Sequence, residues 1–114
     1  MVNRVILVGR LTADPDLRAI ATGGHVAHIR LATNSYAGRD EDGKRREEAE
    51  FHQLVVFGKQ AEIAGEYLRK GQLMYADGRL STSSWEDEKG VKRYRTEVIL
   101  DTFRMLSPRE AAAA

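Results

Sequence analysis

The chain has 114 residues, which suits one domain with a single hydrophobic core. Apolar residues make up 42 % and charged residues 31 %, a composition that excludes a disordered chain, and the absence of cysteine excludes disulfides, thiolate nucleophiles and thiolate metal ligands. The net charge of +1 leaves nucleic acid open as a partner, because the 18 Lys and Arg residues can gather on one face while the 17 acids lie elsewhere.

No apolar stretch approaches the roughly 18 residues that a membrane-spanning helix needs. The N-terminal residues lead directly into a strand-like run without the pattern of a signal peptide. A chain without cysteine is also compatible with a reducing compartment. We therefore expect a soluble protein of the cytoplasm.

The first part of the chain predicts two strands separated by turns. Residues 3–10 (NRVILVGR) are β-branched and apolar, which is typical of a strand with both faces largely buried. Turn residues follow, and the short segment 17–21 between them is left unassigned. Residues 25–33 then alternate between two faces and form the second strand.

The middle of the chain predicts a polar segment, a strand and a helix. Residues 37–50 (AGRDEDGKRREEAE) hold nearly every residue type that avoids a core, so we expect a solvated loop or the mobile tip of a hairpin. Residues 51–57 (FHQLVVF) alternate and form the third strand. Residues 60–70 are mostly good helix formers, with cations in the last turn and Gly71 as the stop, which predicts a helix.

The last part predicts a hairpin of two strands, residues 73–85 and 91–103, joined by the polar loop 86–90. Gly78 marks a bend or bulge in the first of them. The alternation assigns to the inward rows Met74, Ala76, Gly78, Leu80 and Thr82 on one strand and Tyr94, Thr96, Val98 and Leu100 on the other.

Five strands with one short helix between the third and the fourth is the element order of the OB-fold, an all-β Greek-key barrel. Such barrels commonly bind oligonucleotides or oligosaccharides, but a fold alone does not decide the function. We expect one OB-fold domain over residues 1–106, followed by a short disordered end over residues 107–114.

Aromatic side chains on outward rows are the first candidates for a binding site. Sequence-tolerant binding of a single nucleic-acid strand needs flat aromatic faces for stacking beside cations that follow the phosphates. Phe51 and Phe57 share one face of the third strand, although packing beneath the polar loop or the helix is equally compatible with the pattern. Trp85 stands among Ser, Asp and Glu near a hairpin tip, with little core to enter, so it is the stronger candidate.

Cations accompany these aromatic residues on the strands and in the polar segment. The candidates for phosphate contact are Arg30, Lys44, Arg45, Arg46, Arg79, Arg93 and Arg95. Because Glu47 and Glu48 follow the basic run 44–46 directly, a merely solvated charged loop is its default interpretation. Tyr67 on the helix and Tyr75 amid apolar strand residues are expected in the core or in a subunit interface.

We find no constellation for catalysis or metal binding. His25 and His28 are three residues apart on a strand and point to opposite faces, which spoils joint metal ligation. Asp14 and Asp16 flank a proline in a turn, where acids usually hydrogen-bond the backbone. No serine has a histidine base beside it in the sequence. We therefore expect neither an enzyme nor a cofactor.

Several segments together resemble a known family. They are NRVILVGRLTADPDLR near the N-terminus, GGHVA at 23–27, LATN at 31–34, EFHQLVVFGKQAEIAGEYLRKG from residue 50 and GRLSTSSWEDEKGVKRYRTEV from residue 78. Over residues 2–106 the chain resembles the bacterial-type single-stranded DNA-binding proteins. Five ordered segments are far more specific than any one of them.

The resemblance implies an OB-fold subunit of a homotetramer that binds and protects single-stranded DNA, whatever its sequence, in replication, recombination and repair. The family's stacking positions fall on Phe51, Phe57 and Trp85, with Tyr36 the nearest candidate for a fourth. Its cations map onto Arg4, Lys59, Lys70 and Arg93, and its subunit contacts onto His52 and Tyr75.

One feature of the family is missing, and two other functions stay open. Family members usually continue into a disordered tail with an acidic end, whereas this chain stops at Ser107-Pro-Arg-Glu and four alanines, so recruitment of repair and replication proteins through a tail is not supported. The alternatives are a primosome-type OB-fold dimer that bridges replication proteins and a hydrolase built on an OB barrel. The aromatic set argues against the first, and the second lacks a cluster of ligands.

Overall fold

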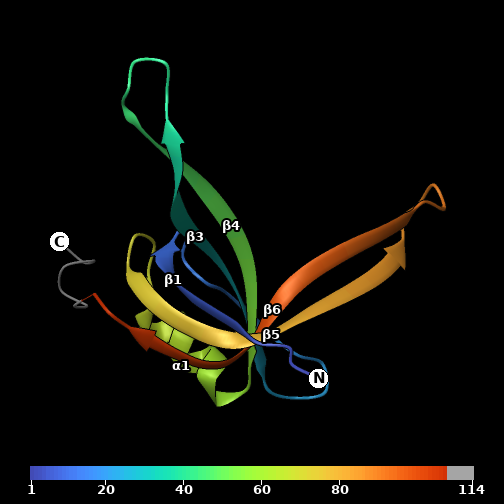
Figure 1. Ribbon diagram of the computed structural model, residues 1–114. Coiled ribbons are helices and arrows are strands. Elements are labelled where there is room, and N and C mark those ends of the chain that lie inside the picture. Colours follow the sequence, from blue (N-terminus) through green and yellow to red (C-terminus); the bar gives the residue numbers. More distant parts are fainter. Residues whose placement is uncertain (108–114) are drawn as a thin grey trace.

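Six strands and one helix form the part of the chain that the computed structural model describes, residues 1–107 (Figure 1). In chain order they are β1 (Val5–Leu11), β2 (Asp16–Ala19), β3 (His25–Arg39), β4 (Arg45–Phe57), α1 (Lys59–Tyr67), β5 (Leu73–Glu86) and β6 (Lys92–Met105). The expected disordered end lies, apart from Ser107, outside the described residues.

Five of the strands close into a barrel. β1 pairs with β5, β5 with β6, β6 with β4, and β4 with β3, which returns to β1 through Arg10 opposite Ala32. The β4–β6 contact is parallel, and the other pairings are antiparallel. This is an OB-fold, so the predicted fold is confirmed. β2 adds a short strand along β3, which overlaps the segment 17–21 that the sequence left unassigned and begins one residue earlier, at Asp16.

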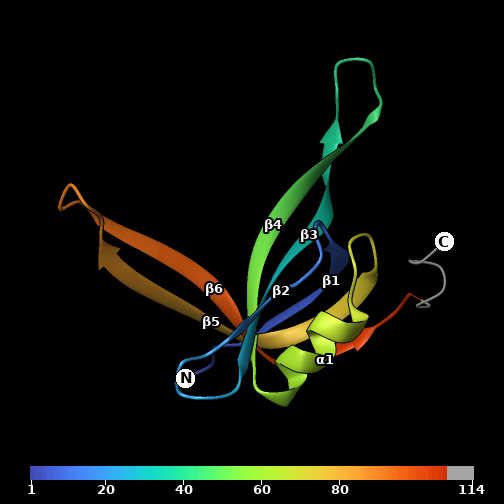
Figure 2. The same cartoon turned by 180° about the vertical axis from the view of Figure 1, so that it is seen from behind.

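The helix α1 lies beneath the barrel, with Ala61 and Ala64 buried against the core (Figure 2). It ends at Tyr67 and not at residue 70 as predicted, because the side chain of Leu68 is fully buried in the core and the backbone there becomes extended. The predicted cations therefore lie beyond the last turn. No helix within residues 1–107 is long and apolar enough to cross a membrane.

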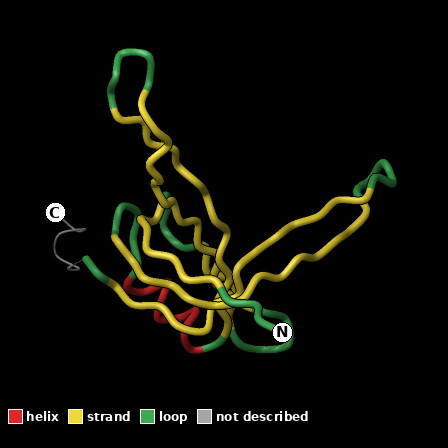
Figure 3. The backbone as a smooth tube through the Cα atoms, in the orientation of Figure 1, coloured by secondary structure: helices red, strands yellow, loops and turns green. Residues whose placement is uncertain are grey.

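Two long hairpins, β3–β4 and β5–β6, project from the barrel in different directions (Figures 1 and 3). Of the two structures expected for residues 37–50, the loop is wrong and the end of a hairpin is found, because the β3–β4 ladder runs out to Tyr36 opposite Glu47 and resumes at Arg39 opposite Arg45. Residues 45–51 are exposed throughout, so backbone pairing holds this ribbon together without any apolar alternation. Patterning cannot reveal such a strand.

The expected burial is wrong on β1 and β5, and also on β6, where Tyr94 and Thr96 are exposed. Ile6 and Val8 on β1 are exposed, although both faces of this strand were expected to be buried, because no second layer covers its outer side within residues 1–107. Leu80 and Thr82 are exposed as well. Both belong to the part of β5 that has already left the barrel.

Gly78 marks the place where β5 leaves the barrel. The register between β5 and β6 shifts between Asp77 and Gly78, so the predicted bulge is confirmed. A Cβ at Gly78 would collide with the carbonyl oxygen of Ile99, which explains why only glycine fits at this corner. The corner sets the direction in which the β5–β6 hairpin points.

Candidate nucleic-acid interface

Three predicted aromatic side chains lie on one side of the β3–β4 hairpin. Phe51 and Phe57 on β4 alternate with the core residue Leu54 and therefore point away from the core. Ala32 lies opposite Phe51 in the ladder, and residues opposite each other share a side. Tyr36 follows Ala32 at an even spacing along β3, which places it on the same side.

This side continues across β6 and β5. Leu54 and Val98 are partners in the parallel β4–β6 contact and both are buried, so the residues of β6 next to Val98 point outwards. Trp85 on β5 lies opposite Arg93 in this outward row. We call the continuous surface the outer face. Its aromatic and basic members are Tyr36, Phe51, Phe57, Trp85, Arg30, Arg45, Arg79, Arg93 and Arg95.

The four aromatic side chains of the outer face are each between 45 % and 55 % exposed. Phe51 and Phe57 therefore do not pack beneath a loop or the helix, the alternative that the pattern left open. Large apolar side chains grouped on a surface mark a site of interaction.

An arginine lies over three of these four rings. The guanidinium carbon of Arg45 is 4.9 Å from the ring centre of Tyr36, that of Arg30 is 5.1 Å from Phe51, and that of Arg95 is 5.4 Å from Trp85. Such contacts hold a cation at an aromatic face. The outer face thus places positive charge directly beside three of its four aromatic rings.

Two other predicted cations, Arg4 and Arg46, are tied to carboxylates. Arg4 donates hydrogen bonds to Asp77 at 2.9 Å and to Asp101 at 2.8 Å. Arg46 donates to Glu48 at 2.9 Å and, by alternation, lies on the side opposite the outer face. The structure does not bring either charge to the aromatic residues.

Arg93 belongs to the outer face but is also paired. Its Nε donates to a carboxylate oxygen of Asp87 at 3.0 Å. The backbone N–H of Val91 donates to the same side chain, and these bonds, with that of Val91 first, hold the pKa of Asp87 below its ordinary value. Arg93 therefore helps to fix the turn beyond Trp85.

The remaining predicted cations form no ion pair within residues 1–107. Arg79 lies on the outer face of β5, opposite Ile99. Lys44 lies in the β3–β4 turn, Lys59 begins α1 directly after the strand that carries Phe57, and Lys70 lies between α1 and β5. Only Arg79 of this group stands in the same sheet surface as the aromatic residues.

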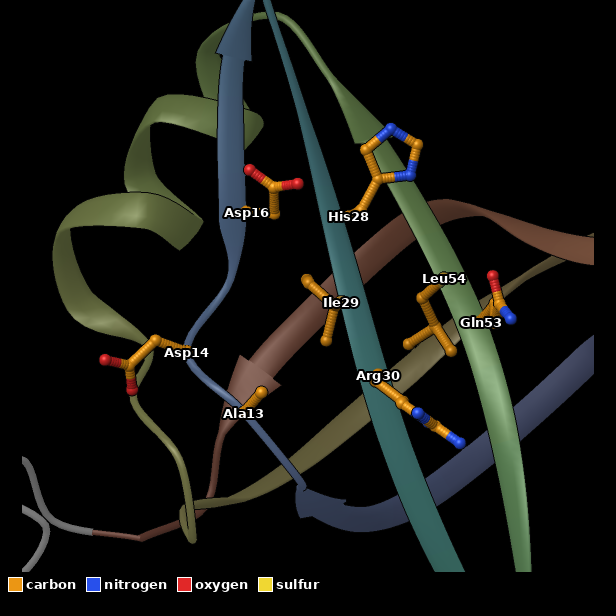
Figure 4. A pocket seen from close by; sticks show the side chains of 8 residues that line it. All are labelled: Ala13, Asp14, Asp16, His28, Ile29, Arg30, Gln53 and Leu54. Atoms are coloured by element: carbon orange, nitrogen blue, oxygen red, sulfur yellow. The ribbon is translucent and has the colours of Figure 1, made fainter.

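A hollow of about 280 Å³ lies beside this surface on β2, β3 and β4 (Figure 4). Its acids serve the local structure, because Asp14 accepts a 2.8 Å hydrogen bond from the backbone N–H of Lys70 and Asp16 is paired with Arg18. No group of three or more His, Cys, Asp or Glu in residues 1–107 could hold a metal ion. The hollow is lined by Ala13, Asp14, Asp16, His28, Ile29, Arg30, Gln53 and Leu54.

Comparison with known proteins identifies the family. A model described as the single-strand binding protein family matches residues 2–106. The chain belongs to this family. The solved structure of Plasmodium falciparum SSB in complex with ssDNA is similar to it with a TM-score of 0.83 and 29 % sequence identity, over 94 % of this chain and 97 % of that chain. The resemblance inferred from the sequence is thereby confirmed.

The two predicted subunit contacts of this family member, His52 and Tyr75, lie outside the aromatic set. His52 points to the side opposite Phe51, with its Nε2 2.9 Å from the hydroxyl oxygen of Thr33. Tyr75 lies opposite Val8 of β1, and its hydroxyl donates to Asp77 at 2.8 Å. That hydrogen bond raises the pKa of Tyr75 above its ordinary value.

One exposed aromatic residue escaped the sequence reasoning. Tyr94 was placed in an inward row, yet it is 66 % exposed, with the Nζ of Lys92 5.6 Å from its ring centre. The row does reach the core further along β6, at Val98. The polar residues Lys92 and Thr96 in the same alternating row as Tyr94 were the available signal that this side of the strand faces solvent here.

Proposed function

We propose that the chain binds single-stranded DNA on the outer face, with unpaired bases stacked on aromatic rings and phosphates held by cations. The alignment of Tyr36, Phe51, Phe57 and Trp85 on one side of a continuous sheet carries the proposal. Membership of the single-strand binding protein family supports it, as does the likeness to a family protein solved in complex with ssDNA.

Stacking supplies affinity without reading sequence, because every base has a flat face. Each base stacked on an aromatic side chain contributes roughly 1–3 kcal/mol. The rings of Phe51 and Phe57 have no hydrogen-bonding group with which to select a base edge. We therefore expect binding to tolerate all sequences, with preferences that follow stacking strength.

The arginines at the rings have two roles in this mechanism. In the free protein the guanidinium groups of Arg30, Arg45 and Arg95 lie over aromatic faces. When a base arrives it replaces the guanidinium on the face of the ring, and the guanidinium turns to the neighbouring phosphate, which releases condensed counterions. Affinity should then fall as the salt concentration rises.

The same geometry selects single strands over duplex. In a duplex the bases stack on one another and their faces are not available to protein rings. The outer face presents rings and not donors for a groove edge. We infer that the protein holds DNA strands apart once they are open and shields the bases during replication, recombination and repair.

We propose that the protein acts by binding alone. The single-strand binding protein family is a DNA-binding family and not a catalytic one. The histidines have local partners that suit a structural role: His25 lies 3.3 Å from Glu62, His28 lies 3.9 Å from Glu97, and His52 contacts Thr33. We place this activity on the bacterial nucleoid in the cytoplasm, where single strands arise.

We further propose that the binding unit is a homotetramer. One edge of β1 is unpaired over residues 5–9 within the described chain, since its pairing with β3 begins at Arg10. The exposed side chains of Ile6 and Val8 stand beside this edge and next to Tyr75. An open strand edge with apolar neighbours favours pairing with another copy. His52, half-buried on the side opposite the outer face, is the second residue that we propose for a subunit contact.

Titration with oligothymidine tests the function directly, because Trp85 is the only tryptophan. We expect tight binding with quenching of tryptophan fluorescence and far weaker binding to duplex of the same length. The variant Trp85→Phe is the matched control, because it should bind the oligonucleotide, as shown by its anisotropy, but give no quenching. Unchanged Trp85 fluorescence at saturating single-stranded DNA would refute stacking on this residue.

A further inference from the structure

The β5–β6 hairpin has a second face that the outer face does not include. Residues opposite each other in its ladder share a side, and Ser84 lies opposite Tyr94, with Thr82 opposite Thr96. By alternation, this row points away from the side that carries Trp85. We call it the reverse face. Its members are Lys92, Tyr94 and Thr96 on β6 and Leu80, Thr82, Ser84 and Glu86 on β5.

The reverse face has the same two ingredients as the outer face. Tyr94 is 66 % exposed, more than any aromatic residue of the outer face, and Lys92 lies 5.6 Å from its ring centre. Lys92 forms no ion pair within residues 1–107. An exposed ring beside a free cation is the local composition that recognises a stacked base and its phosphate.

The two faces meet along a free edge of the hairpin. Regular pairing of β5 with β1 ends at Gly78, and within the described chain no strand covers β5 from Ser81 to Trp85. The side chains along this stretch are hydroxyls followed by the indole, without a carboxylate (STSSW). Alternate backbone N–H groups of an edge strand point to solvent and can donate to phosphate.

We propose that the reverse face is a second stacking site for single-stranded DNA, reached over the free edge of β5, with Tyr94 under a base and Lys92 at a phosphate. The DNA strand then passes around the β5–β6 hairpin, with one base stacked on Trp85 on the outer face and another on Tyr94 on the reverse face. This inference rests on the proposed function, because it extends the path of the same strand.

A tryptophan moved to the reverse face separates the two proposals. In the double variant Trp85→Phe, Tyr94→Trp the only tryptophan lies at residue 94, and we expect its fluorescence to be quenched by oligothymidines longer than about 16 nucleotides, the upper end of the span of one OB-fold. If the fluorescence of the tryptophan at residue 94 does not change while that of Trp85 in the original chain is quenched, the second site is refuted and the proposed function stands. If neither responds and no binding is seen, both fail.

Alanine and phenylalanine at residue 94 provide the matched pair. Tyr94→Ala should weaken binding of the longer oligothymidine about tenfold, the loss of one base–aromatic stack, whereas Tyr94→Phe keeps the ring and should bind as the original chain does. Equal affinity of Tyr94→Ala and the original chain would overturn the proposal. So would a fluorescence change at residue 94 that depends on protein concentration without DNA, because it would assign this face to contacts between copies.

Discussion

The side-chain amide of Asn3 pairs with the backbone of Leu80 as a further strand residue would. Its Nδ2 donates to the carbonyl oxygen of Leu80 at 2.9 Å, and its Oδ1 accepts from the N–H of Leu80 at 2.9 Å. The regular β1–β5 ladder ends at Val5 opposite Gly78, so this double hydrogen bond carries the pairing past the corner. Asn3 therefore holds the base of the β5–β6 hairpin, which carries Trp85, against the N-terminal segment.

Replacing Asn3 should weaken the attachment of the β5–β6 hairpin at its base. Asn3→Ala removes both hydrogen bonds and is expected to lower the free energy of unfolding by about 1 kcal/mol. It should also weaken DNA binding a few-fold, because Trp85 is then held less firmly against the strand. Asn3→Asp keeps the acceptor for the Leu80 N–H, so its stability and its DNA affinity should lie between those of Asn3→Ala and of the original chain. Denaturant unfolding and oligothymidine titration measure both effects, and an Asn3→Ala chain that matches the original in each would contradict this role.

Phe51 should tune affinity without affecting stability. Because half of its surface is exposed, Phe51→Ala is expected to leave the melting temperature nearly unchanged while binding weakens about tenfold through one lost stack. Phe51→Trp enlarges the stacking face and should tighten binding. Anisotropy titrations with a labelled oligothymidine compare the three. A chain with Phe51→Ala that binds like the original would remove Phe51 from the site.

Substitutions at Arg79 and Arg46 form a matched pair that tests the electrostatic contribution to DNA binding. Arg79 lies on the outer face and forms no ion pair within residues 1–107, whereas Arg46 is paired with Glu48 on the opposite side of the sheet. Arg79→Gln should reduce the slope of log affinity against log salt by about 0.7, the value for one phosphate contact to a single strand. Arg46→Gln should leave the slope as it is. Titrations over a salt series decide this, and equal slopes for both variants would count against the assignment.

Alternation in the sequence predicted which aromatic residues share a side of their strand, because alternation is a local property. The side to which Phe51, Phe57 and Trp85 point follows from the period of two along each strand, whatever the rest of the chain does. The predictions that Leu80 and Tyr94 lie in inward rows are wrong for a reason that is not local. Whether a strand still covers a core depends on where it leaves the barrel, and the bulge at Gly78 determines that.

Pairings between distant residues were equally beyond prediction. Arg4 meets Asp77 and Asp101 only because the barrel brings the N-terminus to the corner of β5 and β6. Nothing near Arg4 in the sequence indicates that its charge is already matched. The helix end follows the same rule, since the burial of Leu68 in the core outweighs the helix propensity of the residues after Tyr67.

Asp87 should make the hairpin tip sensitive to acid. The folded chain holds the pKa of Asp87 below its ordinary value of 3.8, so its contribution to stability is complete above that pH and is lost as the pH falls below it. Protonation weakens the contact with Arg93 and the hydrogen bond from Val91. The protection factor of the Val91 amide, its exchange rate corrected for the intrinsic dependence on pH, should drop between pH 5 and the acid range in the original chain, and Asp87→Asn, which cannot titrate, should show no such step. A step of equal size in both chains would exclude Asp87 as its origin.

A substitution at Val8 tests the proposed association of copies through β1. Its side chain is exposed on β1 beside the unpaired strand edge and opposite Tyr75, so in a tetramer built on this edge it would lie between subunits. Val8→Lys places a charge there and should lower the mass measured by light scattering, because a desolvated, unpaired ammonium opposes association. Val91→Lys, at an equally exposed valine in the β5–β6 turn, is the control and should keep the mass of the original chain. An original chain that scatters as a monomer, or a Val8→Lys chain that keeps the full mass, would show that copies do not associate through β1.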